Sequence, residues 1–107
     1  MTATSIALLL LCACSLGSAA SSNRIVRIAE LEIDAAQLDT YKAALKEEIE
    51  TSIRIESGVL SLSAVALKDN PTQIRILEVY ADDAAYRSHL ETPHFKKYKA
   101  LTQNIAS

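Results

Sequence analysis

The hydrophobic residues between Arg24 and Tyr80 repeat with two different periods, and this change of period is the strongest constraint on the fold. Residues 24–33 (RIVRIAELEI) carry aliphatic side chains at both odd and even positions, which is typical of a strand partly buried on both faces. Residues 34–56 carry apolar side chains at spacings of three and four, the period of an amphipathic helix. The stripe consists of Leu38, Tyr41, Leu45, Ile49 and Ile53. Two further strand-like runs follow at 59–67 and 74–80.

The ends of the first helix have recognisable signals. Asp34 and Gln37 have the spacing of a capping box, so the helix should begin at Asp34. It should run to about Glu56 and stop at Gly58, a residue suited to a left-handed C-terminal cap. In the strand that follows, alternation places Leu60, Leu62, Ala64 and Ala66 on one face.

Helical signals return after the third strand. Between the second and third strands, the sequence KDNPTQ (68–73) has the composition of a turn, which indicates a hairpin. Asp82 or Asp83 should open a helix that reaches about Glu91. Thr92 as cap and Pro93 as first helical residue should start a new helix. Its apolar stripe continues to the end of the chain.

This order of elements predicts an α+β fold of ferredoxin-like type, with an antiparallel sheet and helices on one face. The short strand that ends a ferredoxin-like fold would be absent here, or helix would take its place. Because strands one and three are aliphatic on both parities, the other face of the sheet also needs a cover. A second copy of the chain, packed sheet against sheet, would supply it. The sequence therefore predicts a homodimer.

The N-terminus has a separate character. Residues 5–20 (SIALLLLCACSLGSAA) carry no charge and contain an apolar core too short to span a bilayer, as in a secretory signal. Ser18 and Ala20 fit a small-x-small cleavage site, whereas LCAC resembles a bacterial lipobox with Cys14 as the lipidated residue. We expect a signal at 1–20, a domain at 21–107, and an exported protein that is either periplasmic or a membrane-anchored lipoprotein.

Composition removes several functional classes. The chain has 11 basic and 13 acidic residues and no basic run longer than Lys96-Lys97, which disfavours nucleic-acid binding. Both cysteines lie in the candidate signal, so the domain should contain neither a disulfide nor a thiolate metal site. Only two glycines occur, which excludes phosphate-binding loops. His89 and His94 would lie about 140° apart on a continuous helix, so we expect no shared metal.

The side chains best suited to catalysis are concentrated in residues 77–95 (LEVYADDAAYRSHLETPHF). Glu78 follows two isoleucines on a strand face that should be buried, and a buried carboxylate needs a partner. His89 on the next helix is the expected partner. Such a pair could shuttle protons, or it could be a satisfied polar contact within the core. His94 would either line a cavity mouth or be solvated.

The segments ILEVYAD (76–82) and AAYRSHLETPHFKKY (84–98), with Glu56 and Gly58 ahead of strand two, resemble the antibiotic biosynthesis monooxygenase family, in its small quinol-monooxygenase-like branch. The resemblance covers roughly Arg24 to Ile105. It implies a dimeric α/β barrel of ferredoxin-like subunits, and oxidation of quinol-type aromatics by molecular oxygen without metal, flavin or haem. The absence of tryptophan departs from the haem-degrading branch.

The resemblance also implies roles for individual residues. His89 would be the base or hydrogen-bond donor, and Glu78 would orient it. Tyr80 and Phe95 would shape a substrate cavity, with His94 beside them. The alternatives are a non-catalytic exported dimer that binds a small apolar ligand and a purely structural interaction domain. A cavity beside His89 and Glu78 would favour the first two hypotheses.

Overall fold

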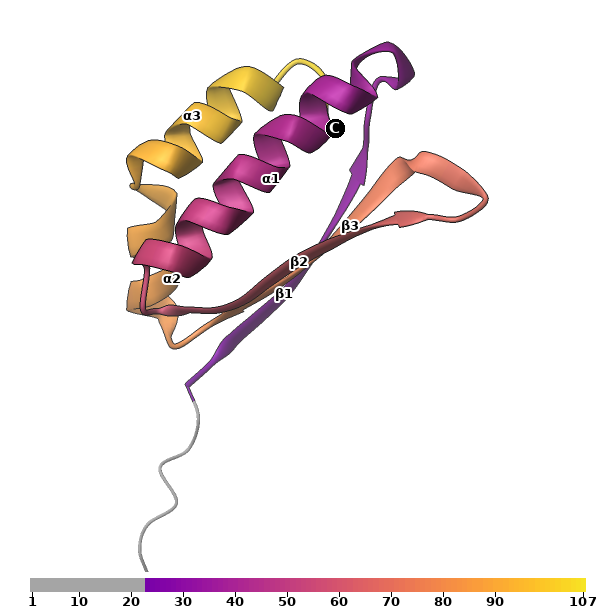
Figure 1. Ribbon diagram of the computed structural model, residues 1–107. Helices are drawn as coiled ribbons and strands as arrows, with labels where there is room; N and C mark the ends of the chain where they lie inside the picture. The colour runs from indigo at the N-terminus through magenta and orange to yellow at the C-terminus, as the bar shows by residue number, and fades with distance from the viewer. Residues whose placement is uncertain (1–22) are drawn as a thin grey trace, which may run out of the picture.

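The computed structural model describes residues 23–107, which form one sheet and the helices that cover it (Figure 1). The elements are β1 (Ile25–Glu32), the 3-10 helix η1 (Ala35–Gln37), α1 (Leu38–Ile55), β2 (Val59–Leu67), β3 (Asn70–Tyr80), α2 (Asp83–Leu90) and α3 (Pro93–Thr102). The expected signal at residues 1–20, with Cys14, Ser18 and Ala20, lies outside the described residues. No helix within 23–107 is long and apolar enough to cross a membrane.

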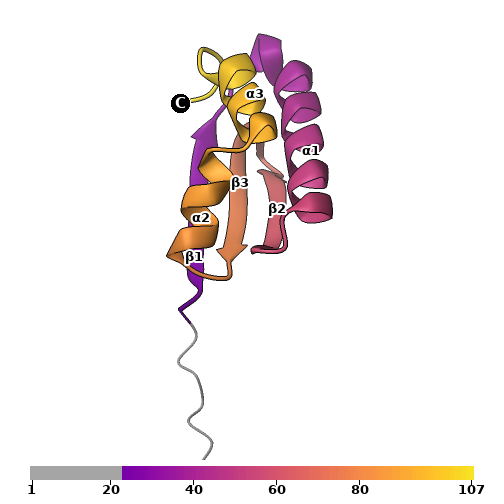
Figure 2. The same cartoon turned by 90° about the vertical axis from the view of Figure 1, so that its left-hand side faces the viewer.

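The sheet has the strand order β1-β3-β2 and is antiparallel throughout. All three helices lie on one of its faces, with α1 toward β2 and α2 over β1 and β3 (Figure 2). After α3 the chain returns to β1, where Glu32 and Ser107 exchange two backbone hydrogen bonds of 3.0 Å. Ile33 and Ala106 form an isolated bridge there. This short pairing stands where a fourth strand would lie, and the predicted ferredoxin-like fold is confirmed.

Most of the helix signals have their predicted effect. Asp34 accepts a hydrogen bond from the backbone of Ala36, although it caps η1, and α1 begins only at Leu38. Asp82 caps α2 by accepting from the Ala85 amide at 2.7 Å. Thr92 caps α3 in the same way, with Pro93 in the first turn. These caps fix the break between α2 and α3.

Strand β2 differs from the simple alternation. A register shift between Val59 and Ser61 inserts one extra residue into the strand. As a result Val59 and Leu62 are buried, whereas Leu60 is 44 % exposed. The prediction that Leu60 shares one face with Leu62 is therefore wrong. Strand β3 also begins earlier than expected, at Asn70, so that Lys68 and Asp69 alone form the hairpin turn.

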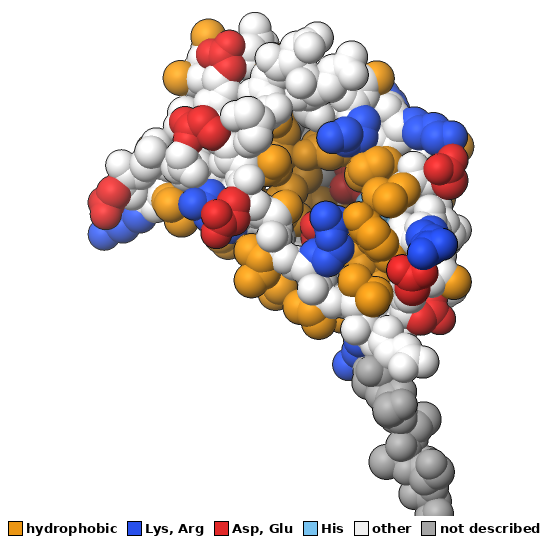
Figure 3. Space-filling view, turned by 180° about the vertical axis from the view of Figure 1, so that it is seen from behind, with side chains coloured by type: hydrophobic (Ala, Val, Ile, Leu, Met, Phe, Trp, Pro, Cys, Tyr) orange, Lys and Arg blue, Asp and Glu red, His pale blue; other side chains and the backbone are white. Residues whose placement is uncertain are grey.

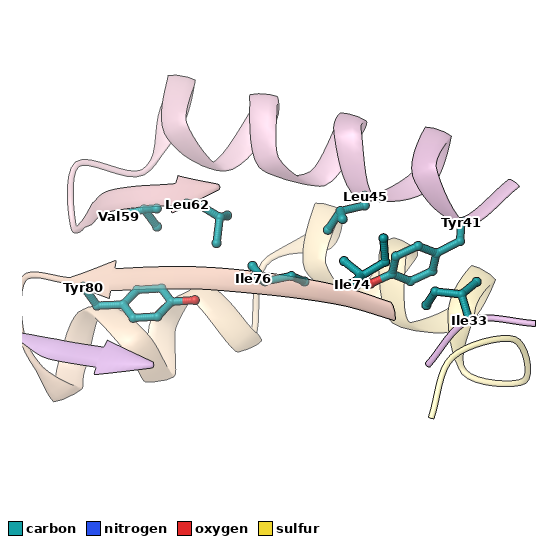
Figure 4. Packing of buried hydrophobic residues seen from close by; sticks show 8 residues of the cluster. All are labelled: Ile33, Tyr41, Leu45, Val59, Leu62, Ile74, Ile76 and Tyr80. Carbon is teal, nitrogen blue, oxygen red and sulfur yellow. The ribbon is translucent and has the colours of Figure 1, made fainter. Parts of the chain in front are cut away.

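The core lies between the sheet and the helices (Figure 4). Its buried members come from the inner faces of the strands and from α1, and they are Ile33, Tyr41, Leu45, Val59, Leu62, Ile74, Ile76 and Tyr80. Tyr41 and Tyr80 are fully buried. Of the predicted α1 stripe, Tyr41 and Leu45 are in the core, whereas Ile53 is 47 % exposed. Glu48 and Ser52 are buried on the same face of α1 instead.

Gly58 is required for a reason other than the predicted left-handed cap, because no residue described here has a positive φ. A Cβ atom added at Gly58 would lie 2.6 Å from the Cβ of Ala85 on α2. The glycine therefore allows the start of β2 to approach α2 closely. This approach determines where α2 sits on the sheet.

We expect Gly58→Ala to lower the free energy of unfolding by about 1–3 kcal/mol, because a methyl group at this contact cannot be accommodated without shifting α2. Ala85→Gly removes the opposing methyl group and should restore part of the loss. Urea denaturation of both single variants and the double variant would measure the coupling. Simple additivity of the two single effects would contradict the close-approach explanation.

Tyr41 should make the fold sensitive to alkaline pH. Burial, together with the Tyr98 hydroxyl 2.7 Å away, raises the pKa of Tyr41. A raised pKa contributes stability below the unfolded value of about 10, and that stability is lost as pH rises beyond it. Between about pH 9 and 11, Tyr41→Phe should therefore lose about 1 kcal/mol less unfolding free energy than the wild type. Urea denaturation at the two pH values would measure this difference. If the wild type and Tyr41→Phe lost the same unfolding free energy between them, this assignment would be contradicted.

Candidate active site

A cavity of about 270 Å³ lies between the inner face of the sheet and all three helices. Its apolar wall includes Ala29, Leu31, Leu62, Ile76, Leu90 and Phe95. Its polar groups are Arg27, Glu48, Glu78, Tyr86, His89, Tyr98 and Lys99. Figure 3 shows this face hollowed, with hydrophobic side chains around the opening, acidic side chains inside and basic side chains beside it. The cavity expected beside His89 and Glu78 is thus present, and both residues line it.

Glu78 is held on the cavity wall by two neighbours. The Tyr80 hydroxyl donates to Glu78 Oε1 at 2.6 Å, and Arg27 Nη1 lies 3.4 Å from Oε2. Burial and this hydrogen bond raise the pKa of Tyr80, which keeps its hydroxyl in the donor form. The Arg27 guanidinium also lies over the Tyr86 ring, 4.6 Å from its centroid. An acidic and a basic group therefore lie side by side at the cavity.

His89 is 2 % exposed and lies between two carboxylates. Its Nε2 is 3.2 Å from Glu48 Oε1, and its Nδ1 is 3.0 Å from Glu56 Oε2. Burial disfavours the charged imidazole, but the hydrogen bonds with Glu48 and Glu56 outweigh it and raise the pKa of His89. Glu48 is itself buried, and it accepts a second hydrogen bond from Ser52 at 2.9 Å.

His94 joins this network from the first turn of α3. Its Nε2 lies 2.6 Å from the same Glu56 oxygen that contacts His89. Burial raises the pKa of Glu56, but the hydrogen bonds with His94 and His89 lower it by more. The break at Thr92 and Pro93 lets the two histidines approach, with ring centroids 6.2 Å apart. His89 and His94 therefore do not lie on one continuous helix, and the predicted separation of about 140° does not apply to them.

The expected hydrogen bond between His89 and Glu78 is absent, because each has other partners. Tyr80 connects them instead: its hydroxyl bonds to Glu78 and its ring lies 5.3 Å from the His89 ring, centroid to centroid. Tyr80 and His94 do not line the cavity, whereas Phe95 does. His94 bonds to Glu56, and its side chain is 11 % exposed.

Sequence reasoning missed Glu48, Arg27 and Tyr98 as cavity residues. The position of Glu48 could have been predicted from the sequence. It lies four residues after Ala44 and three after Leu45, and so on the buried stripe of α1. Arg27 shares the parity of Ile25 and Ala29 on β1, which also places it on the inner face. A charged residue on an apolar face is the signal in both cases.

Comparison with known proteins adds independent information. The family model described as "Antibiotic biosynthesis monooxygenase" matches residues 24–101. A crystal structure titled "Putative antibiotic biosynthesis monooxygenase" from Bacteroides thetaiotaomicron is 54 % identical, with a TM-score of 0.78, over 79 % of this chain and 81 % of that one. No match was found among curated proteins.

Two further structures are similar at lower identity. A "putative monooxygenase" from Lactobacillus acidophilus is 32 % identical with a TM-score of 0.79, over 80 % of this chain and 41 % of that longer one. A "Putative antibiotic biosynthesis monooxygenase" from Nitrosomonas europaea is 22 % identical with a TM-score of 0.75, over 80 % and 82 %, and supports the fold alone. From the family match and the first of these structures, this chain belongs to the antibiotic biosynthesis monooxygenase family.

Proposed function

We propose that this protein is a monooxygenase that inserts one atom of molecular oxygen into a small hydroquinone-type aromatic. The observation that carries the proposal is the cavity of about 270 Å³, which has apolar walls and the Glu78–Arg27 pair on one side. It is slightly smaller than the pockets of about 300–1,000 Å³ that hold drug-sized ligands, so a compound of one or two rings is the suitable size.

The reaction balances without an added reductant. Hydroquinone plus O₂ gives hydroxyquinone plus water: one oxygen atom forms a new C–O bond, the other leaves as water, and the substrate supplies all four electrons. The first step is removal of a ring hydroxyl proton, because the phenolate gives up electrons to oxygen more readily than the phenol. The protein needs to accept that proton and stabilise the anion.

We assign these two tasks to Glu78 and Arg27. Glu78 is 8 % exposed and faces the cavity, and its carboxylate keeps lone-pair capacity beyond the hydrogen bonds from Tyr80 and Arg27. Arg27, and Lys99 on the same cavity, supply positive charge that favours a bound phenolate. Tyr80 orients Glu78, and Phe95 shapes the apolar wall.

His89 takes a positioning role in this proposal. Both its ring nitrogens already contact carboxylates, so neither is free to accept a substrate proton. Its contact with Glu48 instead fixes one polar wall of the cavity. His94 contributes through Glu56, which holds the other side of the His89 ring.

We expect Glu78→Gln to lower kcat by about 10²-fold or more, because the amide cannot accept the proton. Oxygen uptake with a panel of hydroquinones would measure it, and ¹⁸O₂ should label the product with one atom. Glu30→Gln is the matched control, since Glu30 is an exposed carboxylate on β1.

Two outcomes would contradict the proposal. Unchanged turnover in Glu78→Gln would remove Glu78 from the mechanism. Saturable ligand binding without oxygen uptake by the wild type would favour the non-catalytic ligand-binding module instead.

We also propose that the chain is a homodimer paired through the outer face of the sheet. Val26, Ile28, Val65 and Leu77 are 64 %, 67 %, 62 % and 42 % exposed on the strands, whereas the helices cover only the inner face. Aliphatic side chains across three neighbouring strands form a patch that monomers seldom leave in water. A second sheet would cover it and complete a barrel.

We expect Ile28→Lys to dissociate the dimer, because the charge would be desolvated at the centre of the patch. Analytical ultracentrifugation would show a shift from twice the chain mass to the chain mass. Leu101→Lys is the control, since Leu101 is 51 % exposed on α3, away from the outer face. A monomeric wild type would contradict the proposal.

A further inference from the structure

Three side chains with metal-ligating atoms meet where α1, α2 and α3 converge. They are Glu56, just after α1, His89 near the end of α2, and His94 in the first turn of α3. One ligand atom from each lies within 4.8 Å of the other two. We propose that these three residues bind a divalent transition-metal ion such as Zn²⁺, at a site separate from the Glu78–Arg27 pair.

The donor set suits that class of ion. Two imidazole nitrogens and one carboxylate oxygen are ligands for zinc and its first-row neighbours, whereas calcium and magnesium prefer oxygen alone. Ligand atoms on a tetrahedral zinc lie about 3.3 Å apart. The Glu56 oxygen is 3.0 Å from His89 Nδ1 and 2.6 Å from His94 Nε2, so these two pairs need to separate by less than about 1 Å. The ligand atoms of the two histidines lie within 4.8 Å of each other, so they need to approach by at most about 1.5 Å.

A buried carboxylate behind His89 supports the assignment independently. Glu48, 5 % exposed, contacts His89 Nε2 at 3.2 Å and is itself held by Ser52. Metal-ligating histidines commonly donate their second ring N–H to a carboxylate in this way. The arrangement leaves Nδ1 as the atom that faces Glu56.

The site is also accessible. The side chains of Glu56 and His94 are 13 % and 11 % exposed, so the cluster is close to the surface. A hollow of about 420 Å³ adjoins it and is lined by Glu56, Gly58, Ser88 and Thr92 among others. An ion could arrive through this hollow, and water could complete its coordination. Because the ligands come from three elements, a bound ion would join the ends of the helices.

The test uses the full chain with Cys12→Ser and Cys14→Ser, so that thiolates at the N-terminus supply no ligand. After treatment with a chelator, calorimetric titration with Zn²⁺ should show one site, and Co²⁺ should give a visible spectrum typical of nitrogen and oxygen ligands. Zn²⁺ should also raise Tm, since it would bind the folded chain. His94→Gln and Glu56→Gln should each weaken Zn²⁺ binding at least tenfold.

Two further variants sharpen the result. Glu48→Gln should weaken binding by about 10–100-fold while keeping the Co²⁺ spectrum, as expected for a group behind a ligand. Glu50→Gln, an exposed carboxylate on the same helix, should leave binding unchanged. Circular dichroism would confirm that each variant is folded. If Zn²⁺ and Co²⁺ do not bind the wild-type site, or bind a folded His94→Gln variant equally well, the proposal is overturned.

Discussion

The architecture around the cavity depends on a single buried imidazole. His89 reaches Glu48 with one ring nitrogen and Glu56 with the other, so it ties α2 to the middle and the end of α1. Removing a histidine from this position would leave two carboxylates near each other in a poorly hydrated place, which is costly. No buried side-chain polar atom among residues 23–107 lacks a hydrogen-bond partner, so the network is complete. Both ring nitrogens of His89 are therefore engaged within the protein.

The polar part of the cavity lining comes from several elements of the fold. Arg27, Glu48 and Glu78 project from β1, α1 and β3 onto the inner face, and each is matched by a partner of opposite charge or by a hydroxyl or imidazole group. Arg27 and Glu78 are cross-strand neighbours in the register of β1 and β3. The antiparallel pairing therefore sets the acid–base pair directly, without any contribution from a loop. Such a pair, on strands that the helices cover, is held more rigidly than one on mobile segments.

The fold and the site were predictable to different degrees. Alternation and helical spacing predicted the elements and their order, and caps at Asp82 and Thr92 predicted where α2 and α3 begin. The pattern failed at Leu60, because a bulge adds one residue and reverses the alternation. It also failed for the partner of Glu78: Tyr80, two residues along the same strand face, was nearer than any residue on the helix. Local periodicity contains no information about either event.

Hydrophobic periodicity was enough to predict that an amphipathic helix packs on a three-stranded sheet in an α+β fold, and the short spacing of Glu78, His89 and Phe95 along the chain predicted that they lie near one another. The pairing of carboxylates with histidines became known from the three-dimensional packing alone. Periodicity fixes the face that a helix buries, but the contact between two side chains depends on how far one helix slides and turns on the next. Here the close approach of Gly58 to Ala85 and the break at Pro93 set those two variables, and so placed His89 and His94 on Glu56.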